Sequence, residues 1–187
     1  LNQSTSQLFR NKGFRIDELY VPLTLVSPKQ TEYKIDSFPE KLLREQNRIL
    51  IKDSAGMGKS TILKMLFRYS VDSSKIIPFY IDLKSLLKND EVLTVEDYIL
   101  ETFPQFNKVP SKDFLLTLLA ETPYLFLFDG ADEVPDKSKK ELFESVLQFC
   151  SKAKKCKYIV ATRDEDKILS SFNSFESFHI SPLEKSE

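Results

Sequence analysis

The feature that most constrains this chain is a short glycine-containing segment between an apolar strand and an apolar helix. The segment Asp53-Ser54-Ala55-Gly56-Met57-Gly58-Lys59-Ser60 directly follows the apolar run Ile49-Leu50-Ile51. Because the chain has only 4 glycines, two of them in one turn indicate backbone that needs positive φ or a close approach. A strand, a glycine turn, Lys-Ser and a helix, in this order, are typical of a phosphate-binding loop.

The backbone of this loop predicts how phosphates would be held. Successive N–H groups can point into one concavity, to which the helix N-terminus adds partial positive charge. We expect Lys59 to reach the β- and γ-phosphates, Ser60 to ligate Mg²⁺ and Thr61 to contact the α-phosphate. The expected nucleotide-binding residues of the loop are Ser54, Ala55, Gly56, Met57, Gly58, Lys59, Ser60 and Thr61.

One position departs from the pattern G-x-x-x-x-G-K-[ST], because Asp53 stands where the first glycine is expected. A carboxylate about 5 Å from a triphosphate would cost several kcal/mol at an effective dielectric constant near 20. We therefore expect the Asp53 side chain to turn away from the phosphates, either to solvent or to free N–H groups at the start of the loop. Asp is also one of the few residues besides glycine that tolerate left-handed φ.

Two further apolar runs end in polar residues. The run Tyr124 to Phe128 is followed by Asp129-Gly130-Ala131-Asp132-Glu133, and an acid in this place predicts an Mg²⁺ contact through water by Asp129. Glu133, or else Asp132, is the expected general base for the attacking water. The run Tyr158 to Ala161 leads into Thr162-Arg163, and we expect Arg163 to sense the γ-phosphate.

Apolar strands alternate with helical patterns along the chain, which predicts an α/β fold with a parallel sheet. The expected strands cover residues 48–52, 76–83, 124–128, 158–161 and 178–180, and the expected helices 38–47, 59–71, 94–103, 111–121 and 136–150. Thr94 and Asp97 resemble a capping box at the start of one helix. The run Lys152, Lys154, Lys155 and Lys157 is expected to be a solvated face.

Composition excludes several classes of protein. Lys and Arg number 27 and Asp and Glu 28, so a mainly electrostatic nucleic-acid or membrane binder is disfavoured. The two cysteines cannot build a secreted disulfide framework, which favours a reducing, cytoplasmic compartment. The longest purely apolar run falls far short of the roughly 20 residues that a membrane-spanning helix needs.

At these motifs the sequence resembles the NACHT family of STAND-class NTPases, which includes NOD-like receptors and bacterial anti-phage sensors. The resemblance runs from about Leu19 to Leu183 and is carried by Ala55 to Ser60, Asp129 to Glu133 and Ala161 to Arg163. It implies a P-loop NTPase three-layer sandwich with a five-stranded parallel sheet in the order 5-1-4-3-2. It also implies that Tyr20, Val21 and Pro22 lie near the adenine.

The resemblance further implies a single nucleotide-binding domain over 1–187, with a lead-in segment at 1–47 and the P-loop core at 48–183. The polar, abrupt ends suggest a piece of a longer protein, whose lid, winged helix, effector and sensor regions are outside this chain. The implied function is a switch that binds ATP or ADP with Mg²⁺. Such a switch drives self-oligomerisation in immune or anti-phage signalling, in response to an unknown trigger and through an unknown effector.

Two other readings stay open at this point. One is a nucleotide-locked scaffold with negligible hydrolysis, and the other is a different oligomeric P-loop ATPase. A guanine nucleotide is disfavoured, because Asn107-Lys108-Val109-Pro110 lacks the Asp of the motif Asn-Lys-x-Asp. By itself the chain is expected to bind nucleotide weakly, to stay mainly monomeric and to hydrolyse slowly, because no lid excludes water from the γ-phosphate.

Overall fold

The central feature of the fold is a seven-stranded, mostly parallel sheet. The computed structural model describes residues 3–4, 14–15, 20–89, 91–102 and 110–182. The strands lie in the order β4 (Glu32–Ile35), β3 (Leu23–Val26), β11 (Glu176–Ile180), β5 (Arg48–Lys52), β10 (Lys157–Thr162), β9 (Tyr124–Asp129) and β6 (Ile77–Asp82).

The expected sheet of five strands is corrected to seven. The five parallel strands are present, and counting them along the chain gives the expected spatial order 5-1-4-3-2. The two additional strands, β3 and β4, come from the lead-in segment and join antiparallel at the β11 edge. They were missed because β3 pairs with a strand about 150 residues away, and no local pattern encodes that distance.

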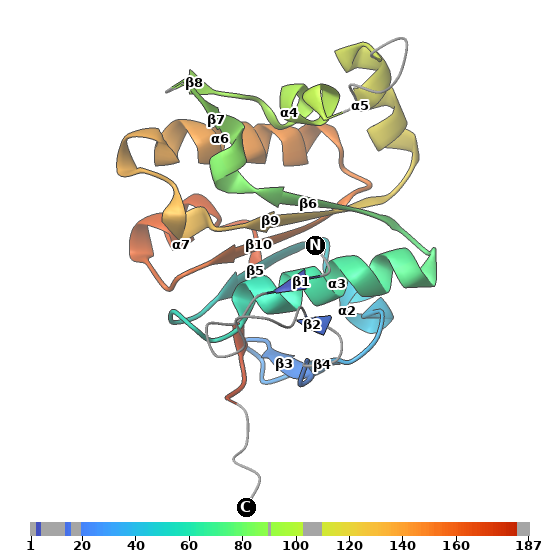
Figure 1. Ribbon diagram of the computed structural model, residues 1–187, viewed down its shortest axis with the longest axis vertical. Helices are drawn as coiled ribbons and strands as arrows, with labels where there is room; N and C mark the ends of the chain where they lie inside the picture. Colours follow the sequence, from blue (N-terminus) through green and yellow to red (C-terminus); the bar gives the residue numbers. More distant parts are fainter. Residues whose placement is uncertain (1–2, 5–13, 16–19, 90, 103–109, 183–187) are drawn as a thin grey trace, which may run out of the picture.

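Helices cover both faces of the sheet, as Figure 1 shows for α3 on one side and α6 on the other. One face carries α2 (Glu40–Glu45) and α3 (Lys59–Ser73). The other carries α4 (Val95–Glu101), α5 (Lys112–Glu121), α6 (Asp136–Lys152) and α7 (Asp166–Ser171). The expected three-layer arrangement is therefore confirmed.

The core divides into two apolar layers because side chains alternate between the faces of each strand. Phe126 and Phe128 of β9 pack under α6, whereas Leu125 and Leu127 pack under α3. All six residues of β9 are buried, as the absence of polar alternation predicted. The sheet is thereby fixed between its helices, and its carboxyl edge can present polar residues in defined positions.

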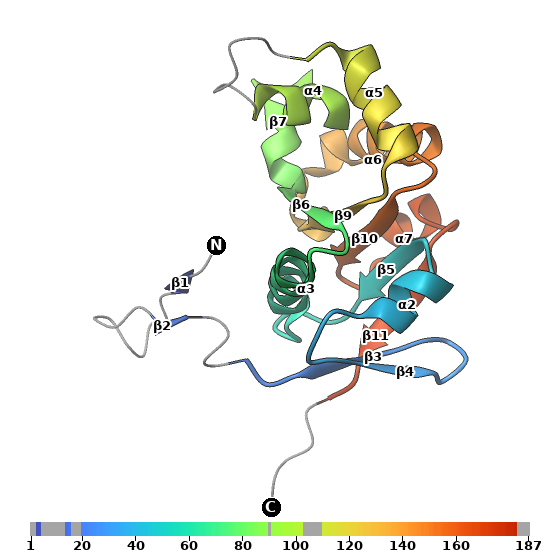
Figure 2. The ribbon, with the colours of Figure 1, turned by 90° about the vertical axis from the view of Figure 1, so that its right-hand side faces the viewer.

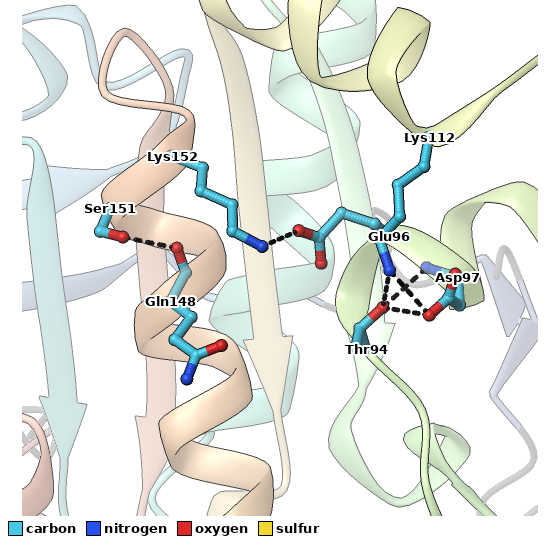
Figure 3. A network of polar contacts seen from close by, with 7 residues as sticks. All are labelled: Thr94, Glu96, Asp97, Lys112, Gln148, Ser151 and Lys152. Carbon is cyan, nitrogen blue, oxygen red and sulfur yellow. Dashed lines mark hydrogen bonds and ion pairs between the residues drawn. The ribbon is translucent and has the colours of Figure 1, made fainter.

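A network of charged contacts fastens α4 to its neighbours (Figure 3). The Thr94 hydroxyl accepts from the Asp97 N–H at 3.2 Å, which confirms the expected cap, and Lys112 Nζ lies 3.0 Å from Asp97 Oδ2. The Glu96 side chain is only 2% exposed and its Oε1 lies 2.9 Å from Lys152 Nζ of α6. Lys152 is therefore no member of a purely solvated face, because it neutralises a buried carboxylate.

Small elements complete the described chain. Short antiparallel pairs join β1 (Gln3–Ser4) to β2 (Phe14–Arg15) and β7 (Leu87–Lys88) to β8 (Glu91–Val92). Short 3₁₀ turns η1 (Leu83–Leu86) and η2 (Ala131–Glu133) follow β6 and β9. Among the helices described, none combines the length and apolarity needed to cross a bilayer. Residues 107–109, which were compared with the guanine-binding motif, lie outside the described residues. So do Leu19, Phe103 and Leu183.

Candidate nucleotide site

Both glycines of the loop between β5 and α3 adopt the left-handed backbone that favours glycine. Gly56 has a φ of 82° and Gly58, which caps α3, a φ of 91°. Position 58 also has no room for a side chain, because an added Cβ would lie 2.8 Å from Leu23 Cδ1. The lead-in strand β3 therefore packs directly against the loop, and the loop's curvature depends on both glycines.

The loop presents a row of backbone donors for which the described part of the chain offers no acceptor. The first intrahelical bond of α3 runs from the Ile62 N–H to the Gly58 carbonyl at 2.8 Å. Within the described residues, no acceptor is found for the N–H groups from Ala55 to Thr61. Free N–H groups at the start of a 15-residue helix form an anion-binding concavity.

Lys59 lies across this loop. Its Nζ donates to the Asp53 carbonyl at 2.8 Å and to the Ser54 carbonyl at 2.6 Å. Burial lowers the pKa of Lys59 below its ordinary value, and the nearby Asp132 and Asp53 carboxylates oppose that shift. The ammonium is thus held by two neutral carbonyls, which an anionic phosphate oxygen can replace with a stronger bond between opposite charges.

Asp53 turns away from the concavity, as expected, and takes the second of the two orientations considered. Its Oδ1 accepts from the Ser54 N–H at 2.7 Å, at the start of the loop. Its Oδ2 accepts from the Ile180 N–H of β11 at 2.9 Å, a contact that the sequence did not predict. Left-handed φ plays no part, since the described residues with positive φ other than glycine are Gln30, Ser74 and Asn89.

Asp129 is the carboxylate at the end of β9, and only 9% of the residue is exposed. Its Oδ1 accepts from the Gly130 N–H at 2.9 Å and its Oδ2 from the Tyr80 hydroxyl of β6. Burial, and then the bond to Asp129, raise the pKa of Tyr80, so this hydroxyl remains a donor. A carboxylate has about four lone-pair sites, so these two bonds leave Asp129 free to accept from a metal-bound water.

The other expected catalytic groups are paired with cations. Arg163 Nε lies 2.8 Å from Asp132 Oδ2. Glu133 forms an ion pair with Lys84 of η1, and that contact raises the pKa of Lys84. Lys84 and Glu133 are both about half exposed, so solvent reaches this pair and it can exchange partners at small cost. Arg163 is also about half exposed, but the Asp132 side chain is only 9% exposed, so this carboxylate needs another cation if Arg163 leaves it.

One cavity of about 290 Å³ brings most of the predicted site residues together. Its lining consists of Ala55, Gly56, Gly58, Lys59, Ser60, Thr61, Asp129, Gly130, Asp132, Glu133 and Arg163. A cavity of about 350 Å³ between α6 and α7 is larger, but it lacks the loop and these acids. The site is therefore assigned by its donors and charges, and not by volume.

Five predicted residues lie outside that lining. Ser54 is exposed at the loop's start, and Met57 packs against the apolar layer under α3. Val21 is 57% exposed, and Tyr20 donates its hydroxyl to the Ile35 carbonyl while accepting from the Leu23 N–H. Pro22 directly precedes Leu23, whose Cδ1 would lie 2.8 Å from a Cβ added at Gly58. This end of the lead-in segment therefore lies next to the loop.

Tyr80, Asp82 and Lys84 belong to the site's surroundings and were not predicted from the sequence. Asp82 ends β6 in register with Asp129, and its Oδ1 would lie 3.6 Å from a Cβ added at Gly130. A polar residue at the carboxyl end of an apolar strand is a usable signal, and it would have identified Asp82. Tyr80 and Lys84 carry no such signal, because their relevance depends on contacts across the sheet edge.

Comparison with known proteins gives one family match and several structural neighbours. The family model described as NACHT domain matches residues 47–187, about three quarters of the chain. No curated protein matches the sequence significantly.

Structures of DnaA and of Cdc6p are among the structural neighbours. The replication initiator DnaA bound to AMPPCP and single-stranded DNA is 13% identical, with a TM-score of 0.50 over 77% of this chain and 44% of its own. Domain III of DnaA from Thermotoga maritima is 19% identical, with a TM-score of 0.47 over 77% of this chain and 58% of its own. Cdc6p from Pyrobaculum aerophilum is 14% identical, with a TM-score of 0.49 over 77% of this chain and 42% of its own. The chain thus spans about half the length of these structures, and the DnaA complex supports a shared fold.

Proposed function

Because the chain belongs to the NACHT domain family, and so to the nucleotide-binding P-loop NTPases, we propose that it is the Mg²⁺-dependent ATP switch of a signalling protein. In this proposal ATP and ADP favour different states of a longer protein, and the ATP state self-associates. The proposed setting is cytoplasmic immune or anti-phage defence. Parts of the protein outside 1–187 would bind the trigger and carry the effector.

One observation carries the proposal: the donor-rich loop and the acidic strand end line the same cavity. The free N–H groups of residues 55–61 would donate to phosphate oxygens, and Lys59 would leave the Asp53 and Ser54 carbonyls to bind the same oxygens. The bound AMPPCP of the DnaA neighbour agrees with this use of the fold. The single-stranded DNA of that neighbour is not part of the proposal, because a net charge of −1 gives this chain no basic excess.

The residues present fit a hydrated Mg²⁺. Ser60 and Asp129 both line the cavity, and oxygen donors of these two types suit this ion, which keeps several waters of its own. We propose that the Ser60 hydroxyl and the Asp129 carboxylate hold it, the latter oriented by the Tyr80 hydroxyl. The ion would neutralise charge on the β- and γ-phosphates.

For hydrolysis, we propose Glu133 as the base that takes a proton from the attacking water. Asp132 would hold Arg163 at the cavity until a γ-phosphate competes for the guanidinium. The adenine would lie over the exposed Val21, beside Tyr20 and Pro22, because Leu23 joins this segment to the loop at Gly58.

A second candidate, the nucleotide-locked scaffold, is favoured by the ion pair between Lys84 and Glu133. A carboxylate paired with an ammonium is a weaker base than a free one, so this pair would slow the hydrolysis of bound ATP. The two candidates share the binding step and differ in turnover.

The test is a pair of measurements on the same protein. Calorimetric titration with Mg-ATP, Mg-ADP and Mg-GTP tests binding, and we expect the adenine nucleotides to bind and GTP to bind more weakly. Steady-state phosphate release from the longest protein that contains this domain then separates the candidates. Turnover supports the switch, tight binding without turnover supports the scaffold, and no binding contradicts both.

A further inference from the structure

Asp53 lies where three parts of the site meet. Its backbone N–H donates to the Thr162 carbonyl of β10 at 3.3 Å, and its own carbonyl accepts from Lys59 Nζ at 2.8 Å. Its carboxylate accepts from the Ser54 N–H at 2.7 Å and from the Ile180 N–H at 2.9 Å. One residue therefore contacts the phosphate loop, strand β10 and strand β11.

The contact with Ile180 extends the sheet by one step beyond its last backbone pair. β11 runs parallel to β5 up to Phe178, which lies opposite Ile51, and β5 itself ends at Lys52. Past that point the chain turns into the loop, so the Asp53 carboxylate supplies the acceptor that a continuing strand would have supplied. A glycine at position 53 has no side chain, and it would leave the buried Ile180 N–H unpaired.

The other side of the β11 end is held by the lead-in segment. Ile180 lies opposite Leu25 of β3, and the Ser181 N–H donates to the Thr24 carbonyl at 2.8 Å. Figure 2 shows β11 between β5 and β3. The C-terminal end of β11 is thus held on one side by β3 and on the other by Asp53.

We propose that Asp53 is a positioning residue that links the occupancy of the phosphate loop to the C-terminal end of β11. The linkage rests on the proposed nucleotide function, in which Lys59 leaves the Asp53 and Ser54 carbonyls for a phosphate. The freed peptide between Asp53 and Ser54 can then turn. Because the carboxylate that holds Ile180 is attached to the same Cα, its position changes with that peptide.

The linkage is tested by hydrogen exchange of single amides, measured by NMR with and without saturating Mg-AMPPCP. In the wild type we expect the nucleotide to change the Ile180 exchange rate by at least about threefold. In Asp53→Gly the Ile180 amide should exchange about tenfold faster without nucleotide, and the response to nucleotide should vanish. The Ile159 amide of central β10 reports any global loss of the fold.

Two other variants sharpen the result. Asp53→Asn keeps one acceptor oxygen, so Ile180 should show intermediate protection even if the glycine variant is too unstable to measure. Asp164→Asn is the matched control, because it removes a carboxylate 3.2 Å from Lys52 Nζ at the same sheet edge. It should leave Ile180 exchange within about twofold of the wild type.

Calorimetry on the same samples separates the two proposals. Normal binding of Mg-AMPPCP with an unchanged Ile180 rate in Asp53→Gly would overturn the linkage alone. An equal response to nucleotide in the wild type and in Asp53→Gly would do the same. Failure of the wild type to bind at all would overturn the proposed function, and the linkage with it.

Discussion

Two groups of charges in this molecule look alike in composition and differ in what they do. Around α4, Glu96 is buried and Lys152 is the cation that neutralises it (Figure 3). At the nucleotide cavity, Glu133 and Lys84 are each about half exposed. The first pair cannot part without leaving a charge in the core, whereas water can replace either partner of the second. Burial thus separates charges that fasten the fold from charges that can change partners during function.

The largest expected effect is at Lys59. Lys59→Ala should lower the affinity for Mg-ATP beyond calorimetric detection while the melting temperature stays near that of the wild type. An ammonium bound to phosphate contributes about 1.5–3 kcal/mol for each charge-assisted bond, so two bonds amount to about 10²–10⁴-fold. Lys64→Ala, on the same helix, is the control and should bind normally. Wild-type affinity in Lys59→Ala would contradict the assignment.

Glu133→Gln should leave nucleotide binding intact and lower steady-state phosphate release by about 10²–10⁴-fold, the usual contribution of a general base. The variant keeps the size of the side chain and removes its basic form. Asp132→Asn is the comparison, because Asp132 is paired with Arg163 instead of Lys84. If Asp132→Asn lost turnover and Glu133→Gln did not, Asp132 would be the base.

Lys152→Met tests the buried group of charges. It should lower the free energy of unfolding by about 1–3 kcal/mol, because Glu96 loses its cation inside the protein. Nucleotide affinity should stay within about twofold. Chemical denaturation measures the effect, with Lys155→Met as control. Lys155 pairs with the exposed Glu121 at 3.5 Å, so its loss should cost less than about 0.5 kcal/mol, and equal effects would remove the contrast.

Lys84→Gln should have the smallest effect of these substitutions, a change in phosphate release. Freeing Glu133 from an exposed ion pair worth about 0–1 kcal/mol should raise phosphate release by no more than about fivefold. Lys88→Gln breaks a similar exposed pair with Glu101 and should leave turnover unchanged. A fall in turnover in Lys84→Gln would mean that Lys84 assists catalysis instead of restraining the base.

Local patterns predicted most of the fold. Apolar runs identified the five parallel strands, and the cap at Thr94 marked the start of α4. The pattern failed for β3 and β4, because each strand has four residues and β3 is held by the distant β11. Hydrophobic periodicity records which side of a segment is buried, and it carries no information about what lies alongside.

The candidate site was likewise predicted in part from local patterns and missed where it depends on distant contacts. The loop glycines, Lys59 and Asp129 were identified because phosphate chemistry needs those residue types at that spacing. The ion pair of Glu133 with Lys84 and the bond of Tyr80 to Asp129 depend on side chains from different strands meeting at one edge. Glu96 was not singled out from the sequence, and only the placement of α6 against it makes it buried.

The pairing of β3 with β11 also orders events during synthesis of the chain. Residues Leu23 to Ile35 leave the ribosome as a short hairpin, and an isolated two-stranded hairpin is at best marginally stable in water. Their partner in the sheet, Ile180, follows about 150 residues later, which takes roughly 8–30 s at translation rates of about 5–20 residues per second. The lead-in hairpin must therefore wait for its β11 partner until about 150 further residues have been made.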